Sequence, residues 1–190
     1  MGNKVEFGLN ELYFGTYTVA ESGAVTLGNP VRVPGARKWT PDTDGEHVGI
    51  DGDDVEYWGA YSEGNDSGDV EVVLFPDTFK EMFLGEARTA DGGLATVKDA
   101  TRPNIYMMFE VSGDQEKRRV IYYNGYLGSI KREYNTLKNG RREPVSESIP
   151  ATFVGDNATG IKKAVYKPGD SGYATLFTNP PVPALASTQS

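Results

Sequence analysis

One stretch decides the fold: residues 70–85, which read Val70-Glu-Val-Val-Leu-Phe-Pro-Asp-Thr-Phe-Lys-Glu-Met-Phe-Leu-Gly85. Apolar residues alternate at its start, which places them on one face of a strand. The proline that follows suits the first position of a helix. Gly85 suits the left-handed cap that ends a helix. The stretch therefore predicts a strand that runs directly into an amphipathic helix at about residues 76–84.

The large apolar side chains around this helix recur at helical spacing, so we expect them to form its core-facing side. They are Phe75, Phe79, Met82 and Phe83. The rest of the sequence offers no other helical pattern this clear. A single helix beside a sheet, without a recognisable catalytic set, is typical of a structural or assembly protein.

Composition favours strands and turns. The 190 residues include 23 Gly, 11 Tyr and 8 Phe, and aromatic residues are enriched in strands. One strand pair is indicated by the alternation in 105–111 and the β-branched and aromatic run in 118–124. We predict one mainly-β domain, a sandwich or barrel-like fold over residues 1–178 with long loops and one flanking helix. Residues 179–190, which begin Asn-Pro-Pro, are predicted to be a Pro-rich tail.

Charge and residue usage exclude several functions. The formal charge is −8, which argues against sequence-specific DNA binding, because phosphate contacts need Lys and Arg. The chain has no Cys, so disulfides and thiolate chemistry are excluded. It shows neither a signal peptide nor an apolar run long enough for a bilayer, so we expect synthesis in a cytosol and no membrane partner.

Residues 37–68 are predicted to be an extended acidic loop, an arm that becomes ordered against a neighbour. Aromatic residues within it argue against plain disorder and favour a subunit contact. A basic loop at about 131–142 is its candidate partner on an adjacent copy. The candidate contact residues are Trp39, Tyr57, Trp58, Tyr61, Lys131, Arg132, Arg141 and Arg142.

Two other functions remain as alternatives. Gly169-Asp-Ser-Gly172 copies the nucleophile motif of chymotrypsin-like proteases, with Ser171 as nucleophile and His47 as base. The residues around His47 do not match that family, and no Asp can be nominated to orient it. A short helix capped by Asp170 or Ser171 is the favoured interpretation of this motif. The aromatic residues of the arm are also consistent with a β-sandwich carbohydrate-binding module.

Two ligand motifs are near misses. Residues 155–162 resemble a phosphate loop, but Ile161 stands where the lysine belongs, so a hairpin turn is favoured. Residues 51–62 resemble a calcium loop, but Glu56 stands where Gly is needed, so a solvated acidic loop is favoured. We therefore expect no cofactor, no resident metal and no enzymatic activity.

Several segments, in order along the chain, resemble the major tail protein family of long-tailed bacteriophages and prophages. They are Lys4–Leu9, Gly23–Pro30, Val33–Ala36, Leu74–Glu86, and Arg118-Arg119 with Tyr123-Asn124. The resemblance covers about residues 4–154. The basic loop at 131–142 and the Pro-rich end have no clear counterpart in that family.

The resemblance implies a tail-tube fold and a structural virion protein. It implies hexameric rings that stack into the conduit for DNA ejection, with DNA only in transit. The implied partners are further copies of the chain, a tape-measure protein, a tail terminator and baseplate or distal tail proteins. The implied location is the phage tail, after synthesis in the bacterial cytoplasm. Within the phage interpretation, a tail-terminator or a head-decoration role is the alternative.

Overall fold

The computed structural model describes residues 8–52, 55–111, 116–134 and 146–186, and the side chains of 46–61 lie outside that description. The described part is mainly β with one helix, as predicted. Its helix α1 spans Asp77–Leu84, and its strands are β1 Leu9–Val19, β2 Val25–Leu27, β3 Val31–Arg32, β4 Ala36–Gly52, β5 Val55–Val72, β6 Ala87–Arg88, β7 Leu94–Ala95, β8 Ile105–Val111, β9 Arg119–Leu127, β10 Lys131–Arg132, β11 Glu147–Phe153 and β12 Lys163–Tyr166.

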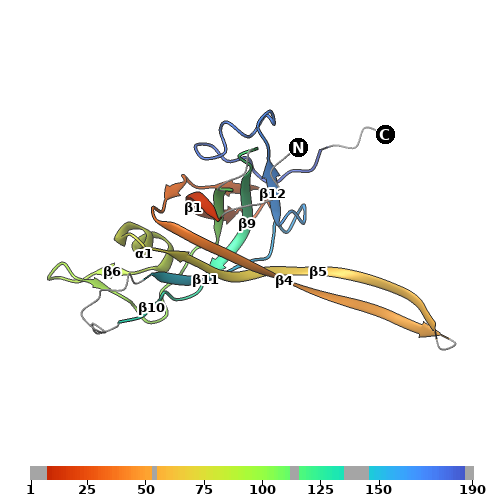
Figure 1. Ribbon diagram of the computed structural model, residues 1–190. Coiled ribbons are helices and arrows are strands. Elements are labelled where there is room, and N and C mark those ends of the chain that lie inside the picture. The colour runs from red at the N-terminus through yellow and green to blue at the C-terminus, as the bar shows by residue number, and fades with distance from the viewer. Residues whose placement is uncertain (1–7, 53–54, 112–115, 135–145, 187–190) are drawn as a thin grey trace, which may run out of the picture.

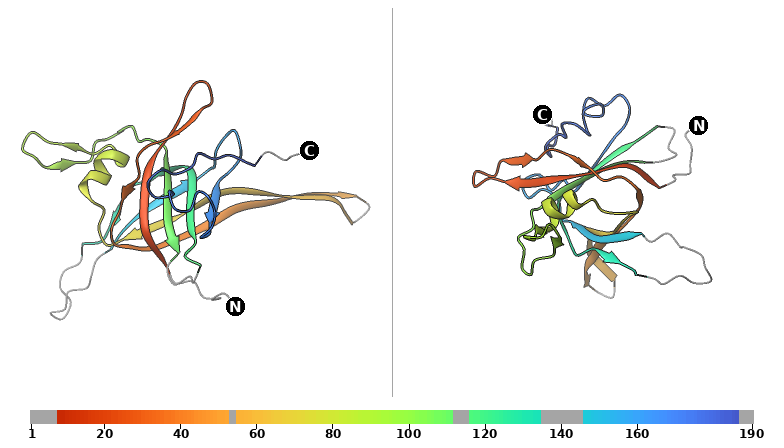
Figure 2. Two further views of the ribbon diagram at one scale, coloured as in Figure 1. Left: turned by 90° about the horizontal axis from the view of Figure 1, so that it is seen from above. Right: turned by 90° about the vertical axis from the view of Figure 1, so that its left-hand side faces the viewer.

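The main sheet runs in the order β2-β1-β8-β9-β11-β5-β4, and its described pairs are antiparallel. Three short strands complete it: β3 pairs with β1, β12 with β9 and β10 with β11. The sheet curls, so that β4 returns beside β1 (Figure 1). A separate two-stranded hairpin, β6–β7, extends from the end of the molecule that carries α1 (Figure 2).

The larger core lies inside this curl, with α1 packed against it. Phe79 is fully buried, 5.1 Å from the ring of Phe14 on β1 and 4.8 Å from the ring of Phe75. Gly85 ends the helix with φ 68°, in the predicted left-handed conformation. The expectation for Met82 was wrong, because its side chain is 49% exposed. The buried positions recur every four residues, from Phe75 through Phe79 to Phe83, and Met82 lies beside that row.

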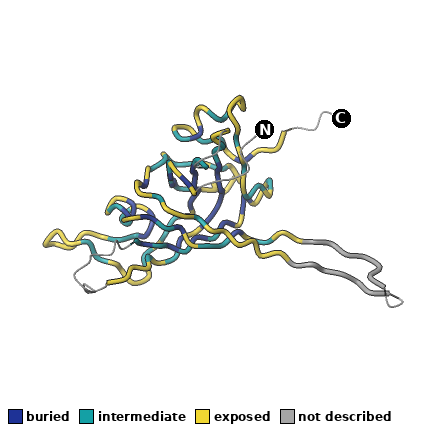
Figure 3. The backbone as a smooth tube through the Cα atoms, in the orientation of Figure 1, coloured by how far each residue is buried: buried dark blue, intermediate teal, exposed yellow. Residues whose placement is uncertain are grey.

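The opposite face of β8 and β9 is buried as well (Figure 3). The C-terminal segment 167–183 lies across it. Leu176 is fully buried there, and the Tyr123 hydroxyl donates to the carbonyl oxygen of Pro181 at 3.0 Å. The start of the predicted tail, residues 179–183, therefore packs on the domain. The sequence shows no helical or strand period here, because this segment is a series of turns.

The predicted hairpin of β8 and β9 is confirmed. Its register shifts beside Asn124, which has φ 49°, a left-handed conformation that Asn tolerates better than most residues. The Asn124 side chain accepts a hydrogen bond from Asn104 at 2.9 Å and donates to the Gly155 carbonyl at 2.7 Å. This bulge fixes the chain that leads from β11 to β12 against the sheet.

The acidic region 37–68 is not a loop. It lies within two strands, β4 and β5, which pair along their whole described length and form the longest hairpin of the molecule. The prediction of an extended arm agrees with this shape, but the prediction of irregular structure does not. Gly and Asp have low strand propensity, so they hide the strands in the sequence, while pairing to a neighbouring strand supplies the backbone hydrogen bonds.

Candidate functional site

The β4–β5 hairpin projects from the domain as a ribbon, at the end opposite α1 and the β6–β7 hairpin (Figures 1 and 2). Strand β11 borders β5 only from the pair Glu147–Val72 to the pair Phe153–Asp66. Beyond Asp66, residues 45–52 pair with 55–63 and with no other described strand. We call this outer part the ribbon arm. Both of its long edges carry backbone groups that no described strand satisfies.

The arm starts from a polar base. The exposed side chains there include Asp42, Asp44, Glu63 and Asn65. An isolated two-stranded hairpin is at best marginally stable in water, and an unpaired strand edge is a ready template for another chain. The arm is therefore the part of the described molecule best suited to contact a partner.

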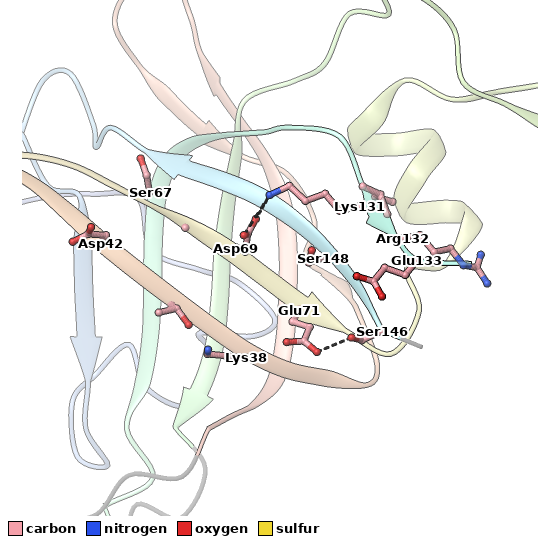
Figure 4. A pocket seen from close by; sticks show the side chains of 13 residues that line it. Lys38, Asp42, Ser67, Asp69, Glu71, Lys131, Arg132, Glu133, Ser146 and Ser148 are labelled. Carbon is pink, nitrogen blue, oxygen red and sulfur yellow. Dashed lines mark hydrogen bonds and ion pairs between the residues drawn. The ribbon is translucent and has the colours of Figure 1, made fainter. Parts of the chain in front are cut away.

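A groove of about 1010 Å³ opens on the outer polar face of β4, β5 and β11, beside β10 (Figure 4). Its charged side chains are partly paired within the chain. Lys131 Nζ lies 3.1 Å from an Asp69 carboxylate oxygen, and the Ser146 hydroxyl donates to Glu71 at 2.7 Å. The groove thus presents mixed charge, without an unbalanced cluster of one sign. Across the described ranges, no group of three or more His, Asp or Glu residues is arranged to hold a metal ion.

Trp39, predicted at a subunit contact, packs against its own chain. Its ring meets Tyr122 and Phe153 edge-on, each at 5.8 Å between centroids. Trp39 lies on β4 near the base of the ribbon, where that strand faces the core. Its aromatic character therefore contributes to core packing, and the sequence pattern alone did not distinguish the two roles.

The basic residues have intrachain partners where the structure describes them. Lys131 pairs with Asp69, and Arg132 Nη1 lies 3.3 Å from Glu147 and stands over the Tyr134 ring. Their contact with a neighbouring copy stays a prediction. The side chains of Tyr57, Trp58 and Tyr61, and all of Arg141 and Arg142, lie outside the described residues.

The structure places the two residues of the protease motif on separate elements. His47 lies on β4 within the ribbon arm, paired across the ladder with Tyr61, and the arm leads away from the domain. Ser171 lies in the turns of the C-terminal segment. Asp170 closes its own turn, with an oxygen that accepts from the Lys167 N–H at 2.7 Å. Asp170 therefore closes a turn, and the short helix that it was predicted to cap is not formed, because residues 171–178 are a series of turns.

The phosphate-loop near miss is also a turn. The Asp156 N–H donates to the Ile161 carbonyl at 3.0 Å, and its carboxylate accepts from Thr159 and from the Tyr17 hydroxyl. Burial acts to raise the pKa of Asp156, but the hydrogen bonds from Thr159 and Tyr17 outweigh it and leave that pKa below its ordinary value. Burial of Tyr17, followed by its hydrogen bond to the Asp156 carboxylate, raises the pKa of Tyr17. A stable carboxylate therefore holds this turn closed.

The buried polar residues were missed by sequence reasoning. They are Asp66, Asn124, Glu147 and Asp156. Glu147 illustrates why. It is 2% exposed and accepts from the Phe75 N–H at 2.8 Å, which joins β11 to the entrance of α1. Nothing local distinguishes these residues from the many exposed acids, because their partners are distant in sequence.

No protein-family model matches the chain, and no curated protein matches it. Among solved structures, the chain is similar to the tube-terminating cap of the anti-feeding prophage, determined by electron cryomicroscopy. The TM-score is 0.46 at 7% sequence identity, over 88% of this chain and 95% of that chain. This likeness is too distant to establish a common fold. Within the described ranges, no helix has the length and apolar character needed to cross a bilayer.

Proposed function

We propose that this chain is a structural, self-assembling subunit of a phage-type tail, and that it forms the tail tube. The ribbon arm carries the proposal. It presents two long strand edges that stay unpaired by the described domain. The sequence resemblance to major tail proteins independently favours the same role.

The arm is long enough to bridge two subunits. Its eight residues from Gly45 to Gly52 extend about 27 Å at roughly 3.4 Å per residue. In a ring, each arm lies beside the next copy and shares its backbone hydrogen bonds with that copy. Such a contact is heterologous, and it closes when the rotation between copies closes. Closed rings cover the strand edge that each arm presents to its neighbour, which reduces the aggregation hazard of that edge.

The finer proposal follows the resemblance. Six copies form a ring, and rings stack into a conduit through which DNA passes without specific binding. The formal charge of −8 favours a bore that repels phosphate. The partners are further copies, a tape-measure protein in the bore, a tail terminator and baseplate or distal tail proteins. The chain acts in the virion, without a cofactor and without catalysis.

The test compares the full chain with a variant in which residues 45–63 are replaced by Asn-Gly. Negative-stain microscopy and sedimentation velocity measure assembly, and near-ultraviolet circular dichroism measures the packing of the domain. We expect rings and tubes from the full chain, and folded single copies from the variant. A control variant shortens the β6–β7 turn at residues 90–92 and should assemble normally.

Three results would overturn parts of the proposal. If the full chain stays monomeric at high concentration, the proposal of self-assembly is wrong. If the variant without the arm still forms tubes, the arm does not have the proposed role in assembly. Rings that never stack favour a terminator over a tube subunit.

A further inference from the structure

Three features coincide where the ribbon arm leaves the sheet. Asp66 is the last β5 residue that β11 borders, through its pair with Phe153. The β4–β5 register shifts immediately beyond it, between the pairs Thr43–Asp66 and Gly45–Glu63. A β-bulge of this kind bends the strand and increases its twist. The direction of the arm is therefore set within these few residues.

Asp66 is a buried carboxylate at this bend, with 3% of its surface exposed. One of its oxygens accepts from the Thr43 hydroxyl at 2.7 Å, across the ribbon. The same oxygen lies 2.8 Å from Lys162 Nζ. Lys162 also donates to the Gly64 carbonyl at 2.8 Å, so a single ammonium group holds two residues of β5. Lys162 is itself mostly buried, with 15% of its side chain exposed.

Lys162 belongs to a part of the chain that the sheet holds in place. It follows the turn closed by Asp156, whose carboxylate is bound by Tyr17 of β1. Its own carbonyl accepts from the Tyr123 N–H of β9 at 2.9 Å. The lysine thus connects the base of the arm to the centre of the sheet. We call the three residues Thr43, Asp66 and Lys162, which meet at the bulge, the clasp.

The clasp is poorly explained as a source of stability alone. Removing two charges from water offsets most of their attraction, so buried ion pairs are weak stabilisers, and in some proteins their role is to select one arrangement over others. Two-stranded ribbons also twist over a wider range than larger sheets, so an arm with no bordering strand needs such a selection.

We propose that Lys162 is a positioning residue: through its ion pair with Asp66, it fixes the direction in which the ribbon arm leaves the domain. The effect on assembly rests on the proposed function, because only an arm held in one direction meets the same surface on every copy. The direction itself is a property of one copy and can be measured without assembly.

The direct test is a distance measurement by pulsed electron paramagnetic resonance. The chain has no Cys, so two labels can be placed cleanly by Ser62→Cys on the arm and Ala174→Cys on the domain, both exposed positions. The labelled protein is diluted with an excess of unlabelled protein, so that the measured distances lie within one copy. The clasp variant is Lys162→Met, with Lys162→Arg as the conservative rescue.

Lys131→Met is the matched control. It removes the same charge and one ion pair to the same strand β5, but the pair with Asp69 is exposed and lies away from the bend. We expect a narrow distance distribution for the parent, the rescue and the control. We expect Lys162→Met to at least double its width while near-ultraviolet circular dichroism stays unchanged. Assembly, followed by sedimentation, should fall at least tenfold in Lys162→Met and stay normal in the Lys162→Arg rescue.

A narrow, unchanged distribution in folded Lys162→Met overturns the proposal. If that variant does not fold, the double change Lys162→Met with Asp66→Asn removes the unpaired buried charge and repeats the test. Failure of both variants to fold makes the pair a stability element and also overturns it. A broadened distribution with normal assembly keeps the positioning role and contradicts the part that depends on the proposed function.

Discussion

In the centre of the sheet, β8 is bordered on one edge by β1 and on the other by β9, and five of its seven residues are buried. Beyond Asp66, the ribbon arm is bordered by no described strand. The centre therefore completes its hydrogen bonds within one chain, whereas the outer edges of the arm pair with no described strand. This difference is the basis of the proposal that the arm meets a neighbouring copy.

The largest expected effect concerns the core beneath the centre of the sheet. Phe79→Ala removes a fully buried ring that contacts Phe14 and Phe75, and it should lower the free energy of unfolding by about 3–5 kcal/mol. Urea denaturation measures the change. Met82→Ala, on the exposed side of the same helix, should stay within about 0.5 kcal/mol. Equal losses from both variants would contradict the assignment of the buried face of α1.

The next effect concerns the second face of the sheet. Leu176→Ala should cost about 2–5 kcal/mol, because Leu176 is fully buried against that face. Thermal and urea unfolding measure it. Leu185→Ala, at a residue 71% exposed in the same C-terminal part, is the control. A neutral Leu176→Ala would show that the C-terminal segment merely rests on the sheet.

The smallest expected effect on stability concerns the ribbon arm. Ser62→Pro removes an N–H from the arm, where Ser62 pairs with Glu46. The free energy of unfolding of the domain should change by less than about 0.5 kcal/mol, because no described strand outside the arm depends on that ladder. Assembly in sedimentation experiments should nevertheless fall. A large loss of domain stability would show that the arm is part of the folding core.

The helix shows what local sequence information predicts well. The Pro and Gly that bound it, and the four-residue repeat of its phenylalanines, are local signals. The structure places the helix within a residue of the predicted start. The helix begins at Asp77 because Pro76, with ψ 150°, is still extended and acts as the cap residue. The same local rule failed for Met82, since spacing alone does not fix the width of the buried stripe.

The candidate site was predicted only in outline. An acidic arm rich in aromatics was recognisable, but its strands were not, because Gly and Asp disguise strand alternation. The packing of Trp39 against its own core was not predicted either, for a related reason. Its ring lies on a strand whose base faces the core and whose far part leaves the domain, and no local pattern marks that transition.

The sequence by itself determined a Cys-free, acidic, mainly-β chain with one short helix and a hairpin at β8 and β9. Those features depend on composition and on residues close together along the chain. Only the tertiary structure decided that both faces of the central sheet are covered, and that Asp66 meets Lys162 where the arm begins. These contacts join residues that are distant in sequence, and burial that depends on such distant partners leaves no periodic trace in the sequence.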